Sequence, residues 1–397
     1  MLRIRVVFAI LFVNMLQTER IYANQSLMGM QTHGFLTQSY IKTDRNNFFG
    51  ESAGRGSIDF RELGVNASIR PFSKLTAGAQ ILYRDAGASE DQKLLLDFAL
   101  LDYRLLYAGG FSSGLRAGRI KNPMGLYNDT RDVAFTRPGI ILPQSIYFDR
   151  ARDLALSYDG LQSYSYFTTD SYEIQMQLAL GYTRLSTSSE ISLFSRNMPG
   201  ELKSLPSYLA KLSIQLFDNH LKLSYSDIGM FVDYLSTPAE GLVQPSLEFR
   251  PKIFSLEFNL ESLVLTGEYA LREFTFTNFS EIPGKSIKTG ESYYMQLAYF
   301  VTPKIKITGR YDVTYLDRTD RTGVTYEEST QGLVPAFTRY SKDYTLGVQW
   351  FINRSWLVML EQHKVSGTSW LPVQDNPDSS LIKKDWWMFS ALVSYRF

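Results

Sequence analysis

The chain has 397 residues, of which 44% are apolar and 14% are aromatic, including 25 tyrosines and 26 phenylalanines. Its formal net charge is +1 and its opposite charges are interspersed, so no basic block indicates nucleic-acid binding. Cysteine is absent, which excludes disulfides and cysteine metal sites, and beyond the N-terminus no run of about 18 apolar residues predicts a membrane-spanning helix.

The N-terminus has the composition of a secretory signal peptide. Arg3 and Arg5 precede an apolar run, Val6–Leu16, which is too short to cross a bilayer as a helix. A polar stretch follows this run. We therefore expect a signal peptide over residues 1–23 and one domain over residues 24–397. The alternative is an amphipathic first helix.

Beyond the signal, apolar and polar residues alternate in segments separated by turn residues. In the segment Leu263–Phe276, for example, Leu265 and Tyr269 alternate with Thr266 and Glu268. A period of two places the apolar set on one face of a strand and the polar set on the other.

Sixteen such strands are predicted. In chain order they are Gln31–Lys42, a segment ending at Arg70, Leu75–Arg84, Lys93–Tyr107, Leu115–Lys121, Asp153–Phe167, Tyr172–Arg184, Ser207–Phe217, His220–Val232, Leu247–Leu260, Leu263–Phe276, Thr289–Val301, Ile305–Leu316, Tyr340–Ile352, Ser355–Ser366 and the C-terminal segment from Trp387. Seven short turns and eight longer connections alternate between them. The fourth strand changes phase, which predicts a bulge near Ala99.

The last strand ends the chain on an aromatic residue. Its apolar face is formed by Trp387, Phe389, Ala391, Val393, Tyr395 and Phe397. A free end of a soluble protein would rarely carry two exposed aromatic rings. This ending resembles the closing strand of bacterial outer-membrane barrels. The resemblance implies that Tyr395 and Phe397 form the signal that such barrels present to the barrel-assembly machinery.

These features together predict an all-β fold, a transmembrane antiparallel β-barrel of sixteen strands. Even strand numbers and alternating short and long connections are typical of such barrels. Closure is required in a bilayer, because each unpaired backbone group in hydrocarbon costs several kcal/mol. The alternative is a soluble β-sandwich or propeller, which would need neither the signal nor the terminal phenylalanine.

The segment Gly118-Arg119-Ile120-Lys121-Asn122-Pro123 resembles the start of the third external loop in substrate-selective porins of the phosphate-selective type. In architecture, the whole mature chain is similar to the sixteen-stranded porins of Gram-negative bacteria. The acidic Pro-Glu-Phe-Gly-Gly type of motif found in many general porins is missing, which leaves the ion preference open.

The resemblance implies a protein of the bacterial outer membrane that lets small polar or anionic solutes diffuse passively. It implies a third external loop folded into the lumen. It also implies contact with outer-membrane lipids and lipopolysaccharide, and no role for nucleic acid. The second connection, Asp85–Gln92, is short, so both a monomer and a homotrimer stay open.

The third connection, Asn122–Arg152, is the candidate constriction. Its centre, Gly139–Pro143 and Ile146–Phe148, is too apolar for an external loop and predicts a packed insert. The candidate constriction residues are Arg116, Arg119, Lys121, Asp129, Arg131, Asp132, Arg137, Arg150 and Arg152. Strand phase places Glu62, Gln80, Arg84, Glu268, Arg272, Arg310 and Asp312 on the lumen wall. Of the candidate constriction residues, Arg119, Lys121, Arg131 and Arg137 would lie near the narrowest point and favour anions weakly. Alternatively, any one of them pairs with a carboxylate and braces the loop.

Two other functions stay open. Long external loops, Leu185–Leu205 and Asp317–Thr338, would allow a structural or adhesion role. A barrel enzyme would need a nucleophile or an activated water beside a histidine and an acid. The three histidines, His33, His220 and His363, lie far apart in the sequence, so we expect no catalytic residues, no cofactor and no metal.

Overall fold

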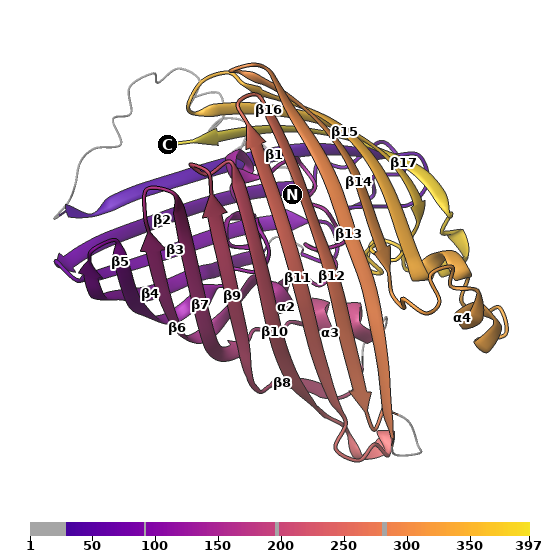
Figure 1. Cartoon of the computed structure of the whole chain (residues 1–397). Helices are drawn as coiled ribbons and strands as arrows, with labels where there is room; N and C mark the ends of the chain where they lie inside the picture. The colour runs from indigo at the N-terminus through magenta and orange to yellow at the C-terminus, as the bar shows by residue number, and fades with distance from the viewer. Residues whose placement is uncertain (1–28, 91–92, 195–197, 280–283) are drawn as a thin grey trace.

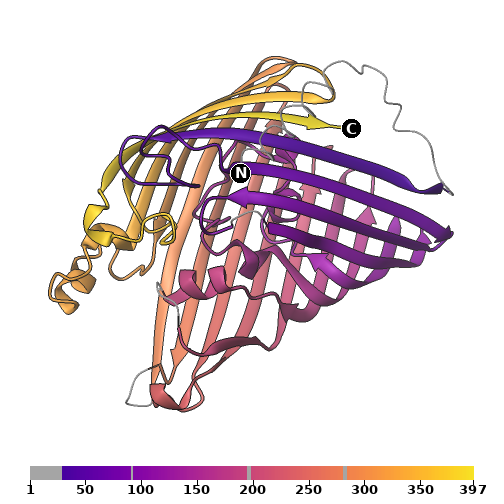
Figure 2. The same cartoon turned by 180° about the vertical axis from the view of Figure 1, so that it is seen from behind.

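The alternating segments pair edge to edge into one closed sheet. The computed structural model describes residues 29–90, 93–194, 198–279 and 284–397; the predicted signal peptide, residues 1–23, lies outside these ranges. The strands are β1 (Gln31–Thr43), β2 (Phe60–Phe72), β3 (Leu75–Ala86), β4 (Lys93–Ala108), β5 (Phe111–Lys121), β6 (Ser157–Thr168), β7 (Tyr172–Thr183), β8 (Glu201–Ser204), β9 (Pro206–Leu216), β10 (Leu221–Leu235), β11 (Ser246–Leu260), β12 (Leu263–Thr277), β13 (Lys285–Thr302), β14 (Ile305–Tyr315), β15 (Tyr340–Phe351), β16 (Trp356–Gly367) and β17 (Asp385–Arg396). Each pairs antiparallel with its neighbours (Figures 1 and 2).

The described residues form a barrel of sixteen strands, because β8 and β9 are two parts of one strand. Both pair with β10. β8 pairs with its residues Val232–Leu235, and β9 pairs with its residues Leu221–Gly229. The interruption falls before Pro206, whose backbone nitrogen cannot donate a hydrogen bond. The predicted strand number is therefore confirmed, although the residues of β8 were expected to belong to a loop.

The remaining regular structure lies in the connections. The helices are α2 (Arg152–Leu156), α3 (Thr187–Phe194) and α4 (Val324–Ser329), with short 3-10 turns at Asn128–Thr130, Ala134–Thr136, Pro238–Glu240, Ala336–Arg339 and Ser379–Leu381. Among the described residues, no helix is long and apolar enough to span a bilayer.

Several strand boundaries and the position of one bulge differ from the sequence-based expectation. The segment expected to begin β6 at Asp153 is helical, because Leu154 and Ala155 pack into an apolar cluster inside the barrel. The bulge expected near Ala99 lies at Asp97, where the register between β3 and β4 slips by one residue. A second slip, between β4 and β5, lies at Leu105.

Side chains divide between the two faces of the wall as the alternation predicts. On β17, Trp387 is 47% exposed on the outer face, whereas Trp386 and Met388 are buried inside. On the outer face of β13 and β15, Met295 and Leu346 are each 62% exposed. A continuous exposed apolar belt of this kind requires a lipid environment. The closed ring excludes the sandwich and the propeller.

The barrel closes where the two ends of the chain meet. β1 pairs with β17 from Phe35 opposite Arg396 to Thr43 opposite Met388. Beyond this ladder, the Phe397 amide donates to the Gly34 carbonyl at 3.0 Å, and the Gly34 amide donates to the Phe397 carbonyl at 3.2 Å. The Phe397 ring lies on Gly34, so a Cβ there would be 2.4 Å from the ring. No strand edge is left unpaired at this seam.

We predict that a side chain at Gly34 weakens the seam. The change Gly34→Val should displace the Phe397 ring and lower the yield of folded, heat-modifiable protein, with an overpacking cost of about 1–3 kcal/mol. Deleting Phe397 should have the same effect. The matched control is Gly309→Val on β14, where an added Cβ meets no atom within 4 Å. Equal folded yields of the two variants would contradict the prediction.

Candidate functional site

The third loop, residues 122–151 between β5 and α2, forms hydrogen bonds with buried side chains of the barrel wall. On one side it reaches β9 and β10. The Lys211 ammonium donates to the Gly125 carbonyl at 2.6 Å, and the Gly125 amide donates to the Ser226 hydroxyl at 3.2 Å. Gly125 has φ +60° and no room for a side chain beside the Tyr147 hydroxyl, which explains glycine here.

On the opposite side the same loop reaches β14 and β16. The Ser145 amide donates to Asp312 at 3.4 Å on β14. The Ile141 amide donates to Glu361 at 3.0 Å on β16. These strands are remote from β5 and β6, between which the loop is inserted. The loop is thus tied to the wall at widely separated positions of the ring.

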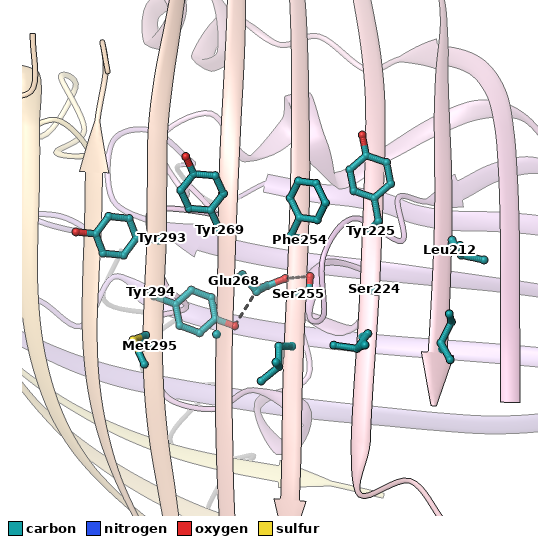
Figure 3. Close-up of a pocket in the computed structure, with 14 residues that line it drawn as sticks. Leu212, Ser224, Tyr225, Phe254, Ser255, Glu268, Tyr269, Tyr293, Tyr294 and Met295 are labelled. Carbon is teal, nitrogen blue, oxygen red and sulfur yellow. Dashed lines mark hydrogen bonds between the residues drawn. The ribbon is translucent and has the colours of Figure 1, made fainter. Parts of the chain in front are cut away.

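Glu268 on β12 is the central anchor of the third loop. It accepts hydrogen bonds from the Tyr147 hydroxyl at 2.5 Å and from the Leu126 amide at 3.1 Å, both in the loop. Its carboxylate also accepts from wall hydroxyls, Tyr294 at 2.9 Å and Ser255 at 2.6 Å (Figure 3). Burying a carboxylate is costly unless donors surround it, and these donors satisfy it.

Ion pairs hold the loop on the side of β2 and β3. Arg84 pairs with Glu62 at 3.1 Å and with Asp149 of the loop at 3.3 Å. Arg131 also pairs with Asp149, at 3.0 Å, and Arg137 pairs with Glu62, at 3.1 Å. Arg84, Glu62, Arg131 and Arg137 are buried, and the Asp149 side chain is 9% exposed. Their charges therefore compensate one another away from bulk water.

A second set of pairs continues this cluster toward β4 and β5. Asp132 of the loop pairs with both Lys121 and Arg152, and Lys121 also pairs with Asp97 at 2.8 Å. Glu90 of the second connection lies 3.8 Å from Arg152. Together the two sets place Arg84, Lys121, Arg131, Arg137 and Arg152 against Glu62, Glu90, Asp97, Asp132 and Asp149. Formal charge within the cluster is balanced.

The ion pairs change the acidity of the loop carboxyls. Burial alone would raise the pKa of Asp149, but the charges of Arg131, Arg84 and Arg152 outweigh it and lower that pKa. The pKa of Asp132 is lowered well below its ordinary value, because Arg152 and Lys121 outweigh the effect of its burial. Both carboxyls are therefore ionised at neutral pH.

Several expected constriction residues lie apart from this cluster. Arg119 lies on the outer face of β5 and binds Asp159 of β6 at 2.7 and 2.9 Å, because strand alternation turns it away from the lumen. Its placement near the constriction was therefore wrong. Arg116 faces inward and binds Asp102 at 2.9 Å. Asp129 is exposed.

Arg150 joins the third loop to two other connections. Its guanidinium donates to the Ser369 carbonyl at 3.3 Å and to the Ser192 carbonyl at 3.1 Å. The residues expected on the lumen wall are all buried and inward-facing: Glu62, Gln80, Arg84, Glu268, Arg272, Arg310 and Asp312.

An apolar cluster inside the barrel was not expected from the sequence. Phe48 and Phe49 of the first connection, which reads as a polar loop, pack with Trp370 and with Ile140 of the third loop. The neighbouring wall contributes Trp386. The signal for this was the pair Trp386-Trp387, since two consecutive tryptophans place an apolar ring on each face of a strand.

The contacts of His363 with two carboxylates were also not expected from the sequence. His363 is fully buried on β16, and its two ring nitrogens lie 2.8 Å from Asp343 and 3.3 Å from Glu361. Glu361 and His363 share one face of β16 by alternation, which is the signal that could have found them. Within the described ranges, no group of three histidine or carboxylate side chains is arranged to hold a metal ion.

The closed ring, the apolar outer belt and the polar inner wall define a transmembrane β-barrel. No protein-family model and no curated protein matches the chain. Among solved structures it is similar to the outer-membrane channel DcaP of Acinetobacter baumannii, with 11% identity, a TM-score of 0.58 and coverage of 95% of this chain and 100% of the other.

Two further structures show the same likeness. OmpT of Vibrio cholerae has 12% identity and a TM-score of 0.57, with 94% of this chain and 100% of the other covered. An anion-selective porin from Comamonas acidovorans has 11% identity and a TM-score of 0.54, with 93% and 99% covered. At these identities the likeness concerns the fold. The resemblance to sixteen-stranded porins is thereby confirmed at that level.

We predict that Glu268→Ala loosens the third loop. Several buried donors would lose their acceptor, at a cost of about 3 kcal/mol, so the thermal unfolding temperature in detergent should fall. The matched control is Glu257→Ala on the inner face of β11, where the half-buried carboxylate accepts from Asn259. A fall of the same size in both variants would argue against an anchoring role for Glu268.

We also predict loss of stability in acid. Because Asp132 and Asp149 have lowered pKa values when folded, their contribution is fully present above the unfolded value of about 4. This contribution to stability is lost as the pH falls through the pKa values that the two carboxyls have in the folded protein. Unfolding temperature should be flat from neutral pH to about 5 and fall below about 4. Asp149→Asn should be less stable at neutral pH and show a smaller fall. An unchanged acid transition in this variant would contradict the prediction.

Proposed function

We propose that the protein is an outer-membrane porin, a water-filled channel through which small polar or anionic solutes diffuse passively. The observation that carries the proposal is a closed barrel whose longest connection is bonded across the interior to β9, β10, β12, β14 and β16. An insert held in this way narrows a lumen without adding chemistry. The solved porins and channels with the same fold support the proposal.

The third loop, in this proposal, folds inward and sets the constriction. Its buried arginines brace the loop rather than set the ion preference, because Arg131 and Arg137 face Asp149 and Glu62. A paired charge contributes little net field to a passing ion. The ion preference would then depend on wall charges that lack such partners.

The surroundings of the channel follow from the same proposal. The exposed apolar belt would contact outer-membrane lipids and, in the outer leaflet, lipopolysaccharide. Residues 1–23 would direct export and residues 24–397 would form the barrel, with Tyr395 and Phe397 presented to the barrel-assembly machinery. A homotrimer is the assembly we propose to test first, since one solved form of OmpT of Vibrio cholerae is a trimer.

Conductance in a planar bilayer tests the function. The purified protein should produce discrete channel openings. Deleting Asp129–Gln144 should raise the single-channel conductance, because the insert is removed from the lumen. The control is an equally long deletion of residues 319–334, in the exposed connection that contains α4.

Two outcomes would count against the proposal. A folded wild-type barrel without conductance would mean that it is not a porin. Unchanged conductance after a well-folded deletion of Asp129–Gln144 would mean that the third loop does not narrow the path.

A further inference from the structure

The outer wall has a hollow of about 730 Å³ on the face of β9 to β13. One row of paired residues forms its floor across β10 to β13: Leu223, Leu256, Gly267 and Met295. Gly267 is the member of this row that has no side chain, so the row is interrupted between Leu256 and Met295. The hollow therefore results from one residue choice in an otherwise bulky apolar row.

The side chains on either side of Gly267 are open to the surroundings of the barrel. Met295 is 62% exposed and Leu256 is 39% exposed. A Cβ at position 267 would lie 3.3 Å from the Tyr294 carbonyl oxygen, its nearest contact beyond the adjacent residues. Water is absent from the hydrocarbon core, and an empty gap would forfeit dispersion contacts. A hydrocarbon chain is the group that fits such a gap.

A row of aromatic rings borders the hollow on the side of the longer connections (Figure 3). The rings pair in order across β10 to β13 and belong to Tyr225, Phe254, Tyr269 and Tyr293. The Tyr225 hydroxyl donates to Asp227 at 3.1 Å, and the Tyr269 hydroxyl donates to Glu291 at 2.9 Å. Rings with an apolar body and a polar tip mark the boundary between hydrocarbon and headgroups. The hollow thus lies on the hydrocarbon side of that boundary.

Lys252 lies just beyond this aromatic row on β11. It is two residues from Phe254 and on the same face of the strand, where it is exposed. The carboxylates at the same level are already engaged, since Asp227 accepts from tyrosines and Glu291 pairs with Arg321 at 2.7 Å. Among the described residues Lys252 has no ion-pair partner. Its charge is complementary to an anionic headgroup.

We infer that this hollow binds one lipopolysaccharide molecule, with an acyl chain over Gly267 and a phosphate of its lipid A against Lys252. The stretch of β11 from Lys252 to Leu256 spans about 13 Å, so the headgroup and one chain of a single lipid can reach both places. In barrels of this kind the longer connections face outward, which turns Lys252 toward the outer leaflet, where lipopolysaccharide resides. The inference goes beyond the proposed channel and does not depend on conduction.

Native mass spectrometry of the purified barrel with added lipid A tests the hollow. Gly267→Leu should bind lipid A about tenfold more weakly than wild type, because the new side chain displaces methylenes of the acyl chain. The matched control is Gly309→Leu on the outer face of β14, where an added Cβ meets no atom within 4 Å. It should bind as wild type. Equal binding by Gly267→Leu and wild type would overturn the inference.

Lys252→Gln tests the phosphate contact at an exposed position where folding is not at stake. Lipid A should bind this variant about tenfold more weakly, whereas lipid A stripped of its phosphates should bind the variant and wild type alike. The matched control is Lys364→Gln on the outer face of β16, where the ammonium lies 5.5 Å from the centroid of the Trp387 ring. It should bind as wild type. Unchanged affinity of Lys252→Gln for lipid A would overturn the inference.

Phosphatidylglycerol separates the two possible sources of the lipid. It should bind wild type about tenfold more weakly than lipid A, and equal or tighter binding would assign the hollow to phospholipid and overturn the inference. The conductance of Gly267→Leu should equal that of wild type, because position 267 faces away from the lumen. A wild-type barrel that binds lipid A but does not conduct would reject the porin function and leave this inference standing.

Discussion

Every part of this barrel depends on the pairing of its first and last strands. Backbone amides and carbonyls facing hydrocarbon have no water to bond, so an open edge between β1 and β17 would carry a row of unsatisfied groups. The nine-residue ladder, from Phe35 opposite Arg396 to Thr43 opposite Met388, and the reciprocal bonds of Gly34 and Phe397 remove that edge. The ring then defines an inner wall, and the loops have a surface on which to pack.

The interior shows a compromise between polarity and packing. A wholly aqueous lumen would leave the apolar segments of the third loop in water. A wholly apolar interior would leave the carboxylates of the wall without hydrogen-bond donors. Apolar and charged side chains of the loops therefore pack against different parts of the inner wall. Trp370 and Ile140 meet an apolar part of the wall, Arg84 and Asp149 compensate each other, and Glu268 collects hydroxyl and amide donors. A buried charge is retained where a partner of opposite sign or several donors reach it.

The sequence predicted the wall well and the interior less well. Period-two alternation is set by the geometry of each strand, so faces such as Trp387 outside and Trp386 inside could be read locally. Loop contacts depend on residues that are distant in sequence. That Phe48 would meet Trp370, or that Glu361 would accept from Ile141, has no local signature. Arg119 shows the limit: its residue type suggested the lumen, but its strand phase places it on the outer face beside Asp159.

The contacts between the first and last connections bear on the order of assembly. Asn46 donates to the Lys383 carbonyl at 2.7 Å across 337 residues of chain, and Lys383 returns a bond to the Asn46 side chain at 2.8 Å. Contacts between residues so far apart in sequence require nearly the whole chain to be in place. The entropy lost in closing such a long loop is offset only when these contacts form. The apolar cluster around Trp370 and Phe48 is therefore among the last parts to become ordered. A barrel in which β17 has not yet paired with β1 would leave these aromatic side chains exposed, so closure of the ring and burial of this cluster should occur together.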